Sequence, residues 1–389
     1  MLAGQSPYNG RRHYKYLHSV TSSSSPRNNL ASIQALRGIA ALLVVCMHEL
    51  FMGFPPPGQF PAPTFSTLWQ LKSFGGTGVQ IFFVISGFIM AYLAAKDRER
   101  SFSSFALDRL TRLAPLYWLT SAYWIAHLAA PDWTFIAKSL LFIPVREFFP
   151  VNGVGWTLTM EAFFYVTFGI VVVRLRRSPA WLVAVFGGIS VLARLAPHSM
   201  ILTFYSDPIV WCFVAGIGVY HLHATRLVAR LRYVILALAL VGFAHAAHGF
   251  LPPHVWGPET VIPWDIPSIL LVLSVTSIEA TDGWPRSILA RLMGSIGDAS
   301  YSLYLSHIIT ISLLNAPLLM FASRLGIAQP NFMLFVFVAA AVVCSIAVYR
   351  FVERPLTRLA RHALRMAQRT RHIQVTPSKF DSTDNSTVS

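Results

Sequence analysis

A long apolar stretch near the start of the chain, framed by two ionisable residues, reads Arg37-Gly38-Ile39-Ala40-Ala41-Leu42-Leu43-Val44-Val45-Cys46-Met47-His48. The surrounding residues 33–52 are long enough to cross a bilayer as one helix, because about 20 residues span its hydrocarbon core. Arg37 and His48 are eleven residues apart, which is about 20° beyond three full helical turns and about 16 Å along the axis. The stretch therefore predicts a membrane span that carries a permanent cation near one end and a titratable imidazole near the other, on one face.

The composition of the whole chain is also that of a membrane protein. Of its 389 residues, 54% are hydrophobic and only 12% are charged, whereas a soluble domain carries about 25% charged residues. The mean hydropathy is +0.55. The three cysteines, Cys46, Cys212 and Cys344, lie inside apolar stretches, so no disulfide framework is expected. These features exclude a soluble enzyme, a disordered protein and a disulfide scaffold.

Apolar runs of suitable length recur along the chain and predict an all-α fold, a polytopic transmembrane bundle of about ten helices. The runs are residues 33–52, 77–95, 113–130, 155–173, 180–196, 208–222, 233–248, 265–280, 300–322 and 332–349.

The basic residues indicate which way the chain crosses the membrane. Of the 31 Lys and Arg residues, 25 fall in the two tails and in alternate connections between the runs. Such an excess is typical of the cytoplasmic side, so we expect both termini in the cytoplasm. The net charge of +15 then reflects topology, and no nucleic-acid partner is expected.

Three regions are predicted from these patterns. Residues 1–31 form a basic, Ser-rich, disordered cytoplasmic tail, residues 32–355 form one integral-membrane domain, and residues 356–389 form a basic and then polar cytoplasmic tail. No metal site is expected, because no His-Glu-x-x-His motif or Cys pair occurs in the sequence.

Polar residues inside predicted spans are functional candidates, because they are costly to bury in lipid. Glu161 lies within the span 155–173, and Tyr165 follows it at i+4 on the same helix face. A buried glutamate can act as an acid, a base or the partner of a histidine; the alternative is a structural hydrogen bond to another helix. Gln80 and Ser86 are polar positions within the span 77–95.

Two arginines stand one helical turn apart at the start of the third span, Arg109 and Arg112. Their guanidinium groups suit a phosphorylated ligand, although anchoring to lipid headgroups is an alternative. Together with Arg37 they would suit an anionic cytoplasmic donor. In the ninth span, Tyr304 and His307 at i,i+3 are expected to face the bundle interior.

Six motifs in order along the chain resemble those of the acyltransferase-3 family of membrane O-acyltransferases, and the resemblance runs from about Ala31 to Pro355. The motifs are Arg37 followed after ten residues by His48, Gly78-Val79-Gln80-Ile81-Phe82-Phe83-Val84-Ile85-Ser86-Gly87-Phe88, Arg109-x-x-Arg112, Trp156-Thr157-Leu158 with Glu161 and Phe164-Tyr165, Tyr301-Ser302-x-Tyr304-Leu305-x-His307, and Glu353-Arg354-Pro355. The chain looks most like members that acetylate exopolysaccharide or other surface glycans. It departs from the family at Gln80, where an acidic residue is common.

The resemblance implies transfer of an acyl group, usually acetyl, from cytoplasmic acyl-CoA to a hydroxyl of an exopolysaccharide, O-antigen or other glycan at the bacterial inner membrane. His48 is expected as the base, with Glu161 orienting it or receiving the acceptor. Arg37, Arg109 and Arg112 are expected to hold the phosphates of acetyl-CoA. The residues expected to contact substrate are Gln80, Ser86, Trp156, Tyr165, Tyr304 and His307. Both direct transfer and an acyl-His48 intermediate remain open, and a homo-oligomer or polysaccharide-assembly partners are possible.

A transporter or flippase for a glycolipid or small solute is the alternative function. Ten spans with buried charges fit it, but the two halves of the sequence show no repeat of the kind many transporters have. Dependence of activity on acyl-CoA would separate the two classes.

Overall fold

The computed structural model describes residues 30–54, 74–145, 149–248 and 261–375. Within these ranges every regular element is a helix, and no strand occurs. Residues 1–29 of the predicted N-terminal tail and residues 376–389 of the C-terminal tail lie outside the described residues. The beginning of the predicted C-terminal tail is helical, because α16 (Arg354–Val375) continues directly from the end of the bundle.

The described chain folds into fourteen α-helices, with short π-helical turns at Gly169–Arg174, Val261–Asp265 and Tyr349–Glu353. The α-helices are α2 (Ala31–Met52), α4 (Thr77–Lys96), α5 (Phe102–Ala126), α6 (Trp133–Leu140), α7 (Trp156–Phe168), α8 (Trp181–Leu195), α9 (Met200–Tyr205), α10 (Val210–Leu222), α11 (Arg226–His248), α12 (Ile266–Asp282), α13 (Ile288–Asp298), α14 (Ser300–Arg324), α15 (Pro330–Val348) and α16.

The all-α membrane fold predicted from the sequence is confirmed, since each of the ten predicted runs falls on a helix. Eight segments of the described chain are long and apolar enough to cross a membrane. The two predicted spans that are not among them are α8, which has only 15 residues, and α5, whose first half carries charged side chains. The count of ten spans and the cytoplasmic location of the termini therefore stay predictions.

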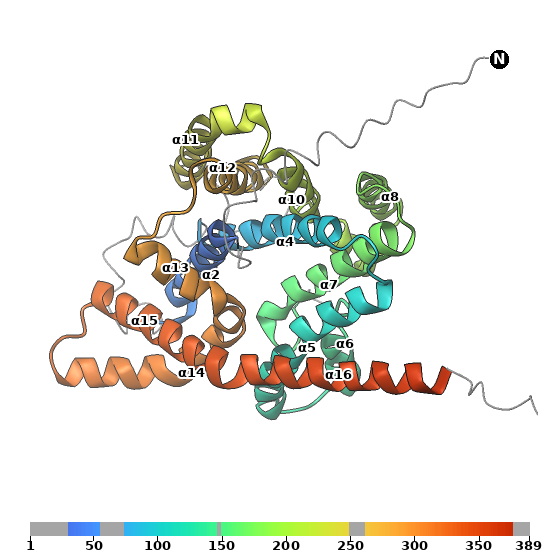
Figure 1. Ribbon diagram of the computed structural model, residues 1–389. Helices are drawn as coiled ribbons and strands as arrows, with labels where there is room; N and C mark the ends of the chain where they lie inside the picture. Colours follow the sequence, from blue (N-terminus) through green and yellow to red (C-terminus); the bar gives the residue numbers. More distant parts are fainter. Residues whose placement is uncertain (1–29, 55–73, 146–148, 249–260, 376–389) are drawn as a thin grey trace, which may run out of the picture.

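Helix α4 runs through the middle of the bundle and packs against α2, α7, α10 and α12 (Figure 1). The backbones of α4 and α10 lie in close contact at Gly87. A Cβ atom added to this residue of α4 would lie only 2.0 Å from the carbonyl oxygen of Phe213 in α10. A Cβ on Gly216 of α10 would likewise lie 2.0 Å from the carbonyl oxygen of Val84. Small residues at such crossings let membrane helices approach closely, and here they fix α4 against α10.

Helix α2, which carries the Arg37–His48 stretch, is held on two sides and at its first turn. It packs against α4 and α13. The carboxylate of Glu279, at the end of α12, accepts hydrogen bonds from the backbone N–H groups of Ala31 at 2.8 Å and Ser32 at 3.2 Å. These are N–H groups that a helix leaves without internal partners, so α12 supplies the N-terminal cap of α2.

Candidate active site

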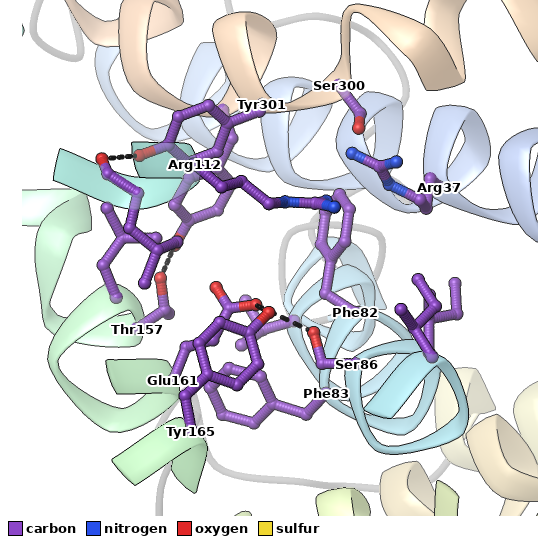
Figure 2. Close-up of a pocket in the computed structure, with 16 residues that line it drawn as sticks. Arg37, Phe82, Phe83, Ser86, Arg112, Thr157, Glu161, Tyr165, Ser300 and Tyr301 are labelled. Atoms are coloured by element: carbon purple, nitrogen blue, oxygen red, sulfur yellow. Dashed lines mark hydrogen bonds between the residues drawn. The ribbon is translucent and has the colours of Figure 1, made fainter. Parts of the chain in front are cut away.

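A pocket with about 660 Å³ of empty space, a volume that includes open solvent, lies between α2, α4, α5, α7 and α14. Figure 2 shows its walls, which combine aromatic rings with a small set of polar groups. The polar side chains that line it are Arg37, Ser86, Arg112, Thr157, Glu161, Tyr165, Ser300, Tyr301 and Tyr304. An apolar cavity with a few convergent polar groups is the usual form of a small-molecule site.

Glu161 is the acidic group of the pocket, and two hydroxyl groups hold its carboxylate. Ser86 of α4 donates a hydrogen bond to Oε1 at 2.9 Å, and Tyr165, one turn further along α7, donates to the same oxygen. Both bonds are drawn in Figure 2. Three of the residues predicted from the sequence are thus brought into direct contact.

Two guanidinium groups occupy the pocket opposite this carboxylate, and Figure 2 shows Arg112 extended toward Arg37. Arg37 donates to the side-chain oxygen of Gln34 at 2.9 Å, while Arg112 makes no hydrogen bond to any described residue. Asp298 lies beside Arg37 at the end of α13, outside the candidate spans; burial raises the pKa of Asp298, and Arg37 opposes that rise. Because the Arg112 guanidinium has no hydrogen-bond partner among the described residues, it is available to an anionic ligand.

Arg109 lies one turn before Arg112 and outside the pocket lining. Its Cζ is 5.7 Å from the centre of the Tyr165 ring, a distance at which a cation is attracted to the ring face. Its Nε and Nη1 atoms are buried and have no hydrogen-bond partner among the described residues. Only two of the three predicted arginines therefore line the pocket, and the third lies against the Tyr165 ring in its wall.

His48 lies beyond the pocket, and a row of rings leads to it. Phe82 and Tyr304, both in the pocket wall, have ring centres 6.0 Å apart. The Tyr304 ring lies 6.2 Å from the ring of His307, which in turn lies 4.9 Å from the ring of His48. His48 and His307, predicted separately as base and substrate contact, thus form a pair.

The hydrogen bonds of this pair assign its tautomers. Nδ1 of His307 is 3.0 Å from the carbonyl oxygen of Leu303, and Nδ1 of His48 is 3.0 Å from that of Val44. A carbonyl oxygen only accepts, so we assign the proton of each ring to Nδ1. The unprotonated Nε2 of His307, 3.1 Å from Nδ1 of His48, then accepts from it as well.

This assignment leaves the lone pair of His48 on Nε2. No described residue forms a hydrogen bond with that atom. The ring nitrogen that a base would use is therefore free, and the other one is held by two acceptors. The group that orients His48 is His307 and not Glu161, whose carboxylate bonds Ser86 and Tyr165.

Gln80 and Trp156 were expected to contact substrate, but neither lines the pocket. Gln80 is buried and its side chain hydrogen-bonds Asp265, which the sequence analysis did not single out. Trp156 packs edge-on against Phe83 with ring centres 6.4 Å apart. Asp265 is the first residue of the predicted span 265–280, and only the fold reveals that it faces Gln80.

An all-helical membrane bundle with an arginine-containing pocket and an oriented imidazole beside it suits group transfer from a charged donor. The sequence profile of the acyltransferase-3 family, described as an acyltransferase domain, matches residues 30–350, and the chain belongs to this family. It is therefore an integral membrane O-acyltransferase, as the sequence motifs predicted. Family membership decides against the transporter alternative.

Several curated proteins are similar to the chain. It is 33% identical over 307 residues to the exopolysaccharide production protein ExoZ of Rhizobium meliloti (strain 1021), covering 74% of this chain and 91% of the relative. It is 24% identical over 369 residues to the acyltransferase MdmB of Streptomyces mycarofaciens, covering 85% and 92%. A putative O-acetyltransferase of Staphylococcus aureus (strain COL) is 24% identical over 375 residues, covering 85% and 57%. No solved structure matches the chain.

Proposed function

We propose that this O-acyltransferase moves an acetyl group from cytoplasmic acetyl-CoA to a hydroxyl of an exopolysaccharide or another surface glycan, at the bacterial inner membrane. The name of the Rhizobium meliloti relative refers to exopolysaccharide production, and that of the Staphylococcus aureus relative to O-acetyl transfer. Transfer of an acetyl group to an exopolysaccharide is the simplest function that agrees with both names.

One observation carries the proposal: the pocket holds two guanidinium groups, and a tyrosine in its wall lies next to the histidine pair. Arg37 and Arg112 line the pocket, and so does Tyr304, whose ring neighbours His307. Arg37 and His48 are about 16 Å apart along α2. A donor whose phosphates bind the arginines can therefore direct its thioester toward His48.

The chemistry follows from the free Nε2 of His48. A glycan hydroxyl is a weak nucleophile, and Nε2 removes its proton as the oxygen attacks the thioester carbonyl carbon. The tetrahedral intermediate then loses the CoA thiolate, and this thiolate accepts the proton from Nε2. While the imidazolium exists, its Nδ1–H donates to Val44 and His307. A positioned base of this kind contributes roughly 10²- to 10⁴-fold.

A second route uses the same atom as a nucleophile. Nε2 of His48 attacks the thioester carbonyl carbon and CoA leaves as the thiolate. The glycan hydroxyl then takes the acyl group from the ring, and its proton passes to the CoA thiolate. Ping-pong kinetics would support this route, and sequential kinetics would support direct transfer.

The proposed function is tested in membranes that contain equal amounts of wild type, His48→Ala or His245→Ala. His245 is an exposed histidine of α11 and serves as the matched control. Each sample receives labelled acetyl-CoA and the host's lipid-linked glycans, and alkali-labile label in the glycan fraction is measured.

We expect label with wild type and His245→Ala and none above background with His48→Ala. Equal label in all three would remove His48 from the reaction. No label in any of them would contradict the proposed donor and acceptor.

A further inference from the structure

A second pocket lies at the end of the bundle where the charge count predicts the cytoplasm. It contains about 1280 Å³ of empty space that includes open solvent. Its lining holds four arginines and one acidic residue: Arg98, Arg100, Arg176, Arg177 and Asp97. Such a concentration of cations around a hollow favours a ligand with phosphate groups.

Hydrogen bonds join the two connections that form much of this pocket, the α4–α5 connection and the segment that follows α7. The guanidinium of Arg176 donates to the carbonyl oxygens of Arg98 and Arg100, which joins the end of α7's π-helical extension to the α4–α5 connection. The backbone of Arg176 has a φ of 55°, in the left-handed region that non-glycine residues seldom adopt. Arg100 forms an ion pair with Asp108. These two arginines therefore shape the pocket.

Arg177 differs from them, because its side chain forms no hydrogen bond or ion pair with any described residue. It is exposed at the pocket, and only its backbone N–H is bonded, to the carbonyl oxygen of Val171 at 3.0 Å. Its charge is thus available to a ligand.

The two pockets follow one another along the same two helices, α4 and α5. On α4, Ile89 lines the first pocket and Leu93, one turn later, lines the second. On α5, Arg112 lines the first and Phe105 the second, a separation of about 10 Å along the helix. The buried and unpartnered N–H groups of Arg109 lie between them on α5.

We infer that the second pocket binds the 3′-phosphorylated nucleoside end of the CoA donor, an inference that rests on the proposed function. CoA carries phosphate at two places, the diphosphate next to the pantetheine arm and the 3′-phosphate of the ribose. The two pockets supply cations at two matching places, Arg37 and Arg112 at the first and Arg177 at the second. The thioester arm then occupies the first pocket.

Binding is measured on the purified full chain in nanodiscs, so that the result does not depend on turnover. The ligands are CoA, 3′-dephospho-CoA and adenosine 3′,5′-bisphosphate, and the proteins are wild type, Arg177→Gln and Arg174→Gln. Arg174 is an exposed arginine close by that does not line the pocket.

We expect loss of the 3′-phosphate to weaken binding to wild type and Arg174→Gln about tenfold, the effect of one charged hydrogen bond. Arg177→Gln should bind CoA about as weakly as wild type binds 3′-dephospho-CoA, and it should lose little more when the phosphate is removed. If removal of the 3′-phosphate weakened binding by the same factor in wild type and in Arg177→Gln, the inference would be overturned while the proposed function stayed intact. Absence of CoA binding to wild type would overturn both.

A lipid headgroup is the other source of the same phosphate chemistry, and a second arm tests it. Adenosine 3′,5′-bisphosphate should bind equally well in nanodiscs of zwitterionic lipid and of lipid with a phosphomonoester headgroup. Displacement of the nucleotide by that lipid in wild type, but not in Arg177→Gln, would assign the pocket to lipid and overturn the inference.

Discussion

His307 shows how one neutral side chain can control another. Its Nε2 accepts from Nδ1 of His48, and so it selects the tautomer that leaves a lone pair on the opposite ring nitrogen. An aspartate would do the same with a negative charge, but an unpaired carboxylate is costly to bury in a membrane protein. A neutral acceptor that is itself fixed by the Leu303 carbonyl avoids that cost.

Replacement of His307 by Ala should therefore lower kcat by about 10- to 100-fold with little change in KM, because His48 loses the acceptor that orients it but keeps Nε2, the atom that removes the proton. His307→Gln should restore part of kcat, since its side-chain oxygen can accept the same hydrogen bond. Initial rates with varied acceptor at fixed acetyl-CoA measure both constants. A raised KM for the acceptor at unchanged kcat would instead support the substrate contact predicted from the sequence.

Single residues were predictable where helical periodicity or spacing was enough. The periodicity predicted that Arg37 and His48 share a face and that Glu161 meets Tyr165. It could not pair His48 with His307, which is 259 positions away, or Gln80 with Asp265. Arg98, Arg100, Arg176 and Arg177 were counted as markers of the cytoplasmic side, because nothing in a sequence tells a lining arginine from an anchoring one.

At the scale of elements, the bundle depends on close helix crossings. The ten apolar runs predicted the helices well, because burial in lipid demands a helix wherever the chain is apolar for long enough. The crossings were less predictable. Gly216 and Gly218 lie in the same helix, yet a Cβ would collide with the Val84 carbonyl only at Gly216 and would meet nothing within 4 Å at Gly218.

This pair gives a matched test of the α4–α10 crossing. Gly216→Ala should destabilise the protein by about 1–3 kcal/mol, the usual effect of overpacking a close contact. Gly218→Ala should be neutral or stabilising by up to about 1 kcal/mol, because Ala favours the helix. Thermal unfolding in detergent, monitored by circular dichroism, compares the two. Equal unfolding midpoints for the two variants would mean that α4 and α10 can move apart without loss of stability.

At the scale of the whole molecule, the orientation in the membrane rests on the distribution of 25 of the 31 basic residues. We expect cysteines introduced by Ser24→Cys and Ser386→Cys, each in a chain without the three natural cysteines, to be inaccessible in intact cells. Both should react with a membrane-impermeant maleimide once the inner membrane is opened. Labelling of only one of them in intact cells would require an odd number of spans.

The cap that Glu279 places on Ala31 and Ser32 also bears on how the protein is made. The chain is synthesised from its N-terminus, and 248 residues separate Ala31 from the carboxylate that completes its helix. At about 5–20 residues per second, the ribosome needs roughly 12 to 50 s to bridge that interval. Helix α2 is thus synthesised well before the carboxylate that caps it. This helix, which carries His48, is consequently capped only after residue 279 of 389 has left the ribosome.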